Sequence, residues 1–378
     1  MELIRLMNRF TSGYVFHAWL SSASLSPLRL GAMLESFGSP EEIYDAFTGS
    51  ETSFRDLLLP EERQRLRALS SDVFLTRMDR LLTEHAIRAF TLNDTAYPSL
   101  LREISDPPAI LFWQGNPACL EGRTLSIVGS RSASYNGRKA TRNLARELSA
   151  RGVTIVSGMA GGVDTEAHRG CLEGNSPTIA VTGCGLDRVY PAGNEGLRDE
   201  ILKKGGLILS EFAPGEKPLG WHFPVRNRIL TGLSPALILM EAKTRSGSMT
   251  SVRHALDQGR DVFVYPGDPD SVQFEGNHQL LREGGIYFTC AGDILEDLRW
   301  LDNPSLIRQN SDCAPKDVSL SREEQTVFEA LKSGPLGFES LSDATGLDSP
   351  ALLGALTILQ VRGLLNASPG KIYQLKEE

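Results

Sequence analysis

Residues Gly129-Ser130-Arg131 combine a glycine, a hydroxyl and a guanidinium directly after an apolar run at 125–128. A glycine turn between a strand and a helix leaves backbone N–H groups unpaired, and the positive end of the helix dipole faces the same volume. The planar guanidinium of Arg131 matches the oxygens of a phosphate. The three residues predict an anion site, although alone they also fit an ordinary turn whose arginine pairs with an internal carboxylate.

Two further segments repeat this chemistry. The segment Ser157-Gly-Met-Ala-Gly-Gly-Val-Asp164 holds glycines that permit positive φ and close backbone approach before a helix that begins at Val163. The segment Lys243-Thr-Arg-Ser-Gly-Ser248 places small donors at another helix start. Several such turns in succession fit a row of phosphates better than they fit one mononucleotide.

The segment His222-Phe-Pro-Val-Arg-Asn-Arg228 adds an aromatic ring and two arginines. Arg226 and Arg228 are two residues apart and diverge by roughly 200° on a helix. We therefore expect one to face the glycine-rich loops and the other to pair internally with Glu241 or Asp164. Phe223 either stacks on an unpaired base, a contact worth ~1–3 kcal/mol, or packs in the core.

Enzymatic patterns are absent from the sequence. It has no G-x-x-x-x-G-K-[ST] string and no G-x-S-x-G after a strand. Asp164 and His168 share a helix face, but no third metal ligand accompanies them, so we expect a hydrogen bond or ion pair between them. Glu241 lacks a partner for acid–base work. The five cysteines form no CxxC pair. We expect no catalytic residue, metal or cofactor.

The elements that position these residues belong to an α/β domain. Short apolar runs at 125–128, 154–156, 178–181, 207–209, 236–240 and 262–265 alternate with helical patterns. This alternation predicts right-handed crossovers and a doubly wound, mostly parallel sheet, whose ligands collect at the carboxyl ends of the strands. Residues 97–116 are expected to form an extended connector.

The flanking segments predict smaller helical units. Residues 1–85 show short helices, including helix, glycine stop, Ser39 cap and second helix within 27–47. Residues 301–319 are expected to be a linker. Helical patterns at 321–331, 338–345 and 349–363, then two strands within 364–375, predict a winged helix. The expected domains are 1–85, 86–300 and 320–378.

The composition limits where the protein can act and what it can bind. The chain has 378 residues, 41% of them hydrophobic, and it has neither an export signal nor an apolar run of the roughly 20 residues that span a bilayer. We therefore expect a cytoplasmic protein. The net charge is −8, yet residues 125–299 carry 20 basic and 20 acidic side chains, which allows a positive groove there. Residues 300–378 carry 7 basic and 11 acidic side chains, which favours protein docking over duplex binding by the winged helix.

Taken in order, the motifs resemble the bacterial DNA-processing protein A (DprA/Smf) family. The resemblance covers nearly the whole chain and rests on these strings: Phe37-Gly-Ser-Pro-Glu-Glu, Val128-Gly-Ser-Arg, Ser157-Gly-Met-Ala-Gly-Gly-Val-Asp, Tyr190-Pro, His222-Phe-Pro-Val-Arg-Asn-Arg-Ile and Gly259-Arg-Asp-Val-Phe. The N-terminal helices resemble its sterile-alpha-motif-like module, and the tail resembles its winged helix.

This resemblance implies a recombination mediator and not an enzyme. Such proteins bind single-stranded DNA through an extended Rossmann-like domain, form a homodimer, protect incoming DNA during natural transformation and load the RecA recombinase. The implied DNA-binding residues are Gly129, Ser130, Arg131, Gly158, Gly161, Gly162, His222, Phe223, Arg226, Asn227, Arg228, Lys243, Gly247, Ser248 and Asn277.

Two departures from the family and two rival hypotheses remain. One departure is Gly161-Gly-Val-Asp164, which replaces a more usual small-Gly-Ile-Asp string. Many members carry lysine after the Tyr-Pro pair, where this chain has Ala192, so one phosphate contact is expected to be missing. A nucleotide-binding phosphoribohydrolase of the lysine-decarboxylase-like group would need a Pro-Gly-Gly-x-Gly-Thr-x-x-Glu signature, which the nearest string at 245–250 lacks. The third hypothesis is a duplex-binding transcription factor.

Overall fold

The computed structural model describes residues 10–300, 321–332, 334–361, 364–368 and 372–375. The chain divides into two compact units, Met1–Leu301 and Asp302–Glu378. The expected linker at 301–319 lies outside the described residues. Within the described ranges, no helix has both the length and the apolar character needed to cross a membrane.

The first unit is built on a nine-stranded sheet in the order β1-β2-β6-β5-β4-β3-β7-β8-β9. All six predicted strands are present and pair in parallel, so the doubly wound α/β prediction is confirmed. They are β3 (Arg123–Val128), β4 (Val153–Ser157), β5 (Thr178–Val181), β6 (Leu207–Ser210), β7 (Ala236–Leu239) and β8 (Asp261–Val264). The chain reverses its direction across the sheet between the neighbours β3 and β7.

Three strands were not predicted. β1 (Arg88–Thr91) and β2 (Ile110–Gly115) add an antiparallel edge to β6, and the short β9 (Ile286–Tyr287) pairs with β8. The predicted connector at 97–116 is wrong in part, because it contains α7 (Ser99–Arg102) as well as β2. Prolines at 107 and 108 interrupt the chain only before β2, whose apolar side chains are buried in the sheet.

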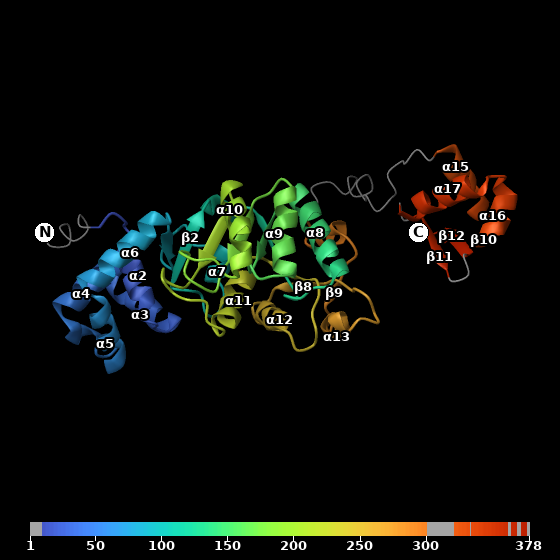
Figure 1. Cartoon of the computed structure of the whole chain (residues 1–378). Coiled ribbons are helices and arrows are strands. Elements are labelled where there is room, and N and C mark those ends of the chain that lie inside the picture. The colour runs from blue at the N-terminus through green and yellow to red at the C-terminus, as the bar shows by residue number, and fades with distance from the viewer. Residues whose placement is uncertain (1–9, 301–320, 333, 362–363, 369–371, 376–378) are drawn as a thin grey trace. The chain divides into compact units, whose positions relative to one another are not determined.

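Helices cover both faces of the sheet (Figure 1). The apolar side chains of α8 (Tyr135–Ala150), α9 (Val163–Glu173) and α14 (Ala291–Asp297) share one core cluster. Those of α11 (His222–Gly232), α12 (Gly247–Asp257) and α13 (Glu275–Arg282) share another with the opposite face. The first unit also contains α10 (Glu195–Lys203) and four short 3-10 helices, η1 (Glu51–Phe54), η2 (Pro117–Leu120), η3 (Ala192–Asn194) and η4 (Val272–Phe274).

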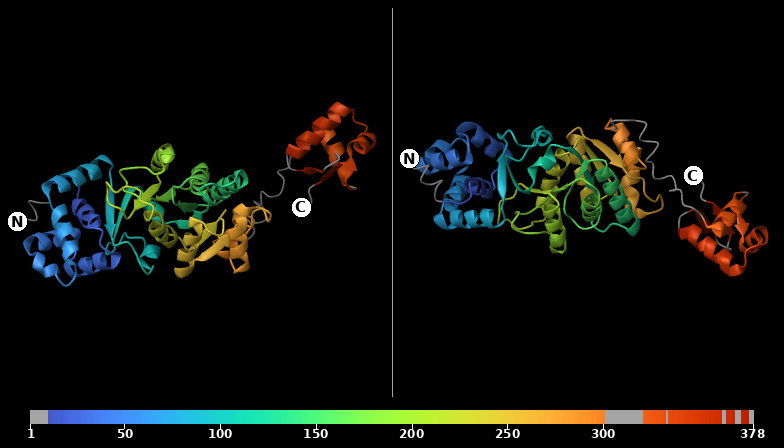
Figure 2. Two further views of the ribbon diagram at one scale, coloured as in Figure 1. Left: turned by 60° about the horizontal axis from the view of Figure 1, so that its bottom comes forward. Right: turned by 90° about the horizontal axis from the view of Figure 1, so that it is seen from above.

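The N-terminal helices pack on the antiparallel edge of the sheet (Figure 2). They are α2 (Val15–Ser22), α3 (Pro27–Phe37), α4 (Pro40–Gly49), α5 (Pro60–Leu69) and α6 (Asp72–Glu84). The predicted glycine stop and cap are confirmed, because Gly38 has a φ of 93° and Ser39 forms a capping box with Glu42. Trp19 and Ile43 belong to the same hydrophobic cluster as Phe112 of β2. The core therefore continues across residue 85, where a domain boundary was predicted.

The second unit confirms the predicted winged helix. Its described residues form α15 (Arg322–Leu331), α16 (Phe338–Thr345) and α17 (Ser349–Val361), with β11 (Leu365–Ser368) and β12 (Ile372–Leu375). A short β10 (Leu336–Gly337), which was not predicted, completes an antiparallel sheet in the order β10-β12-β11. Val327, Leu341 and Leu356 belong to a separate hydrophobic core in this unit.

Candidate functional site

A pocket of about 660 Å³ lies at the carboxyl edge of the large sheet. Loops that follow β3 and β7 line it, and the crevice where strand order reverses is the usual ligand position in doubly wound sheets. The predicted site residues found in the lining are Gly129, Ser130, Arg131, Phe223, Arg226, Asn227, Lys243, Gly247 and Ser248. Tyr190, Pro218, Gly220 and Gln273 also line it and were not predicted. Tyr190 had a sequence signal, the Tyr-Pro pair after β5.

Arg131 and Phe223 form one wall of this pocket. Cζ of Arg131 lies 5.0 Å from the ring centroid of Phe223, which is within the range of a cation–π contact. The Phe223 ring is half-buried, and its centroid is 5.3 Å from that of Tyr190. Arg131 itself is exposed. The wall thus offers both a cation and an aromatic surface to a ligand.

The glycines after β4 serve close packing of two loops. Gly162 has a φ of 73°, and a Cβ on it would collide with the carbonyl oxygens of Ser130 and Arg131. The neighbouring Val163 N–H donates to the Ser130 carbonyl at 3.1 Å. Gly161 also faces the Arg131 carbonyl, at 3.6 Å from its would-be Cβ. The second predicted anion cradle therefore acts as a clamp that fixes the Arg131 loop.

Arg226 forms a buried, charged floor. Its Nη1 donates to the carbonyl of Gly158 at 2.7 Å and to that of Val181. A Cβ on Gly158 would come within 2.6 Å of both the Arg226 guanidinium and the Asp164 carboxylate, so this glycine makes room for the pair. Burial lowers the pKa of Arg226 to about 10 and raises that of Asp164 to about 6, with each opposite charge opposing the shift of the other. Arg226 remains protonated at neutral pH.

Arg228 does not line the pocket. Its guanidinium donates two hydrogen bonds of 2.7 Å to the Glu211 carboxylate and one of 3.1 Å to Asp106. The prediction that one arginine pairs internally is confirmed, but Glu241 and Asp164 are the wrong partners for Arg228. The physical reason is topology, because Arg228 points toward the segment before β2, which the sequence did not reveal as part of the sheet.

His222 and Asn277 are also internal, so they correct the predicted pocket. The His222 ring stacks on Phe212 with centroids 3.8 Å apart, and its Nδ1 lies 3.0 Å from the Gly183 carbonyl oxygen. The Asn277 side chain accepts from the Ala242 N–H at 2.8 Å and donates to the Tyr265 carbonyl at 2.8 Å. Both side chains hold loops of the carboxyl edge from behind.

The helix N-termini differ in what they can bind. At α8, the Glu241 carboxylate accepts hydrogen bonds from the Ser134 N–H at 3.0 Å and from its hydroxyl at 2.6 Å. The helix end predicted to hold a phosphate there is filled by the protein's own carboxylate. The α12 end has no acidic residue in its first turn and no side-chain cap, and Lys243, Gly247 and Ser248 face the pocket there. This end is the better anion site.

The expected pairing of Asp164 with His168 is wrong. Nδ1 of His168 lies 2.8 Å from the Thr178 hydroxyl, and burial lowers the pKa of His168 to about 3. Asp164 instead accepts from the Ala160 N–H at 3.2 Å. Within the described ranges, no three His, Cys, Asp or Glu side chains are grouped to hold a metal ion.

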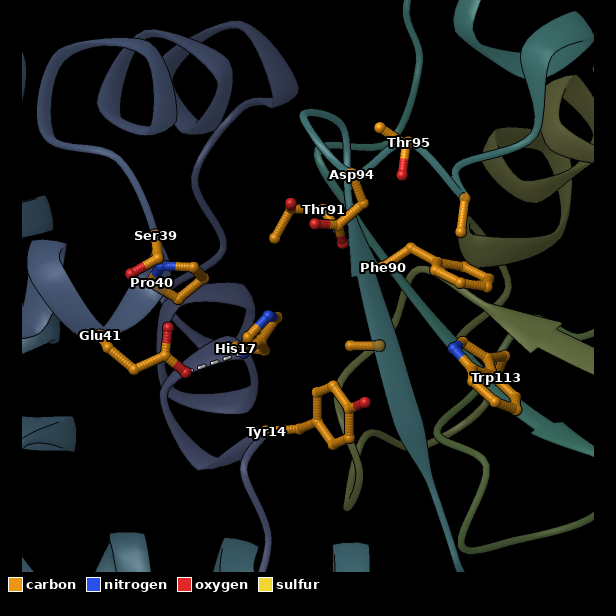
Figure 3. Close-up of a pocket in the computed structure, with 12 residues that line it drawn as sticks. Tyr14, His17, Ser39, Pro40, Glu41, Phe90, Thr91, Asp94, Thr95 and Trp113 are labelled. Carbon is orange, nitrogen blue, oxygen red and sulfur yellow. Dashed lines mark hydrogen bonds and ion pairs between the residues drawn. The ribbon is translucent and has the colours of Figure 1, made fainter. Parts of the chain in front are cut away.

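A second pocket, of about 460 Å³, lies between the N-terminal helices and β1 (Figure 3). Glu41 and Asp94 line it, and His17 lies between them. His17 Nδ1 is 3.6 Å from the Glu41 carboxylate. Burial lowers the pKa of His17 to about 4 and raises that of Glu41. The lining has no lysine or arginine, so this pocket does not suit a phosphate.

The fold and the first pocket define a doubly wound α/β protein with a combined cationic and aromatic pocket at its topological switch point. The family model "DNA recombination-mediator protein A" matches residues 88–299. A model for the winged helix domain of DprA matches residues 312–371. The chain belongs to the DNA recombination-mediator protein A (DprA/Smf) family.

Individual relatives agree with this membership. The chain is 37% identical over 266 residues to DNA processing protein DprA of Streptococcus pneumoniae, which covers 69% of this chain and 94% of that protein. It is 36% identical over 286 residues to protein Smf of Escherichia coli, with coverage of 74% and 75%. The crystal structure of the S. pneumoniae protein superposes with a TM-score of 0.63 at 35% identity, over 74% of this chain and 95% of that chain.

A second solved structure is DNA processing protein A of Helicobacter pylori, which was studied for its single-stranded DNA binding mode. It superposes with a TM-score of 0.51 at 31% identity, over 56% of this chain and 96% of that chain.

Proposed function

We propose that this protein binds single-stranded DNA along the carboxyl edge of its large sheet, without making or breaking a covalent bond. Arg131 and Lys243 would contact phosphates, Gly247 and Ser248 would bind one at the start of α12, and Phe223 would stack on a base. The observation that carries this proposal is the Arg131 guanidinium placed over the Phe223 ring in the pocket wall. That pairing serves a ligand with both an anion and an aromatic face.

The other predicted residues are assigned supporting roles. Gly129, Ser130, Arg226 and Asn227 line the pocket without an exposed cationic group. The remaining ones hold the loops in place from the interior, namely Gly158, Gly161, Gly162, His222, Arg228 and Asn277.

The test is a titration of the full chain with oligothymidine and with duplex DNA of the same length, at several salt concentrations. Binding of the single strand in preference to the duplex, with affinity falling as salt rises, supports the proposal. The rival phosphoribohydrolase function predicts release of free base from nucleotides without oligonucleotide binding. That result would overturn the proposal.

Family membership supports a proposal for the wider role. We infer a cytoplasmic recombination mediator that acts as a homodimer, protects incoming DNA during natural transformation and loads RecA, with a winged helix that docks proteins. We also propose that residues 1–85, 86–300 and 320–378 have separate roles, although the first two segments share one hydrophobic core. Addition of the protein should accelerate RecA filament formation on single strands, and an unchanged rate would contradict this role.

A further inference from the structure

Trp221 carries an exposed aromatic ring next to the pocket lining described above. Trp221 is 60% exposed, whereas Trp19 and Trp113 are buried and Trp300 is half-buried. Trp221 adjoins residues of the pocket lining, so its exposed ring is within reach of a ligand that extends beyond the pocket. Its neighbour Gly220 and the nearby Pro218 line the pocket.

The position of Trp221 follows the order of the strands. The Phe223 ring lies against Gly183, in the loop that follows β5, because a Cβ on that glycine would meet the ring at 3.1 Å. The Trp221 ring contacts Phe212, in the loop that follows β6, with centroids 6.2 Å apart. β5 and β6 are parallel neighbours, and adjacent strands are about 4.8 Å apart. Trp221 is therefore the next ring along the carboxyl edge after Phe223.

His222 holds the neighbouring side chains of Trp221 and Phe223 in position. Its imidazole stacks on Phe212 with an interplanar angle of 18°, and the Trp221 ring meets it edge-to-face with centroids 4.1 Å apart. Because the His222 Nδ1 also lies 3.0 Å from the Gly183 carbonyl oxygen, residues 221–223 are tied to the ends of β5 and β6. Trp221 is thus held in place while its surface remains open.

The charged and aromatic side chains along the carboxyl edge of the sheet indicate which kind of ligand would bind there. Lys243 and Arg131 follow β7 and β3, Phe223 lies at β5, and Trp221 lies at β6, so cations and rings succeed one another in spatial strand order. Lys217 is exposed on the same loop as Trp221 and supplies a further cation. A sheet edge that presents both cationic groups and aromatic rings suits an unpaired polynucleotide, whose phosphates and bases both need partners.

We propose that Trp221 stacks on a second base of the strand whose first base stacks on Phe223. This inference rests on the proposed function, and it extends the site by one nucleotide or more toward β6.

The test uses two ligands, an oligothymidine of roughly a dozen nucleotides, within the range of single-strand site sizes, and thymidine monophosphate. Trp221→Ala should weaken oligothymidine binding by about 5- to 100-fold, the range expected for one lost stacking contact. It should leave thymidine monophosphate binding unchanged, because that ligand needs only the pocket at Phe223. Trp221→Phe keeps an aromatic face and should restore oligothymidine binding.

Intrinsic fluorescence gives a second readout. Oligothymidine should quench the emission of the unaltered protein, and Trp221→Phe should remove most of that quenching while the strand still binds. The matched control is Tyr287→Ala, which removes a 57% exposed ring on β9, at the far end of the strand order, and should change neither signal.

The outcomes separate the two proposals. Tight oligothymidine binding that Trp221→Ala leaves unchanged would overturn this inference and leave the proposed function intact. A Trp221→Ala protein that keeps its affinity but changes its oligomeric state would also overturn it, because the ring would then belong to a protein interface. Failure of the unaltered protein to bind any single strand would overturn both.

Discussion

The Arg131 guanidinium lies over the Phe223 ring, with Cζ 5.0 Å from the ring centroid, although the two residues are 92 positions apart in the sequence. The contact joins the loop after β3 to the start of α11. It orients a mobile cationic side chain on a ring that is itself seated against Gly183. Phe223 therefore orients the Arg131 side chain in the pocket.

Arg131→Ala should weaken single-stranded DNA binding by about tenfold and almost equally for all base compositions, because a phosphate contact carries no sequence information. The slope of log affinity against log salt should fall by about 1. Fluorescence anisotropy across a salt series measures both. Arg146→Ala, which removes an exposed arginine on α8 outside the pocket lining, is the control and should alter neither value.

Phe223→Ala should reduce the affinity for oligothymidine by about 5- to 100-fold, because it removes a stacking surface. The same change frees Arg131, so the effects of Phe223→Ala and Arg131→Ala should be less than additive in a double-mutant cycle. Titration calorimetry on the two single variants and the double variant tests this. Strict additivity would show that the cation–π contact does not couple them.

Arg228→Ala should lower the free energy of unfolding by about 3 kcal/mol, since it removes a buried guanidinium and leaves the partly buried Glu211 carboxylate without its bidentate partner. Urea unfolding followed by circular dichroism measures the loss. Arg169→Ala removes an exposed arginine that pairs with Glu166 on α9, and it should cost no more than about 1 kcal/mol because Glu166 keeps its pair with Arg142. An Arg228→Ala protein that is as stable as the parent but unable to bind DNA would show that Arg228 contacts DNA and has no structural role.

His17 should make the fold sensitive to acid. Its pKa is lowered to about 4, first by burial and against the attraction of Asp94. Between pH 6.5 and about 4 the unfolded chain binds a proton that the folded chain excludes, so the free energy of unfolding falls as the pH falls, by up to about 3 kcal/mol. The raised pKa of Glu41 acts in the opposite direction and offsets part of the loss.

His17→Gln should therefore flatten the fall in stability between pH 6.5 and 4, as followed by chemical denaturation at several pH values. The buried His168 contributes a similar dependence that remains in this variant. His85→Gln, at the end of α6, is the matched control. If the variant and the parent have parallel stability curves, His17 does not carry the effect.

The parallel part of the sheet was predictable because each of its strands is a short apolar run bounded by glycine or polar residues. The antiparallel edge was not, since β1 has only the residues Arg88–Thr91 and β2 follows a Pro-Pro pair that indicates a loop. Local pattern carries no information about which distant strand will pair with such a segment.

The site was predictable as a set of loops but not as a set of contacts. Arg131, Phe223 and Lys243 line the pocket as expected. Arg228 and Asn277 also carry hydrogen-bond donors that could bind DNA, but their side chains point into the protein. Helix phase and strand order decide which donors face solvent. Glu241 reaching the start of α8 is a contact between segments about a hundred residues apart, which no local spacing indicates.

The continuous core between the N-terminal helices and β2 has a consequence for dissecting the protein. Excising residues 1–85 would uncover Phe112 and Ile208 of the sheet, so a truncated chain should aggregate where the intact one stays dispersed. An exchange of the helical segment with that of a homologue would have to carry β1 and β2 along with it. By contrast, the separate hydrophobic core of the winged helix lets that segment be removed or transplanted as a piece.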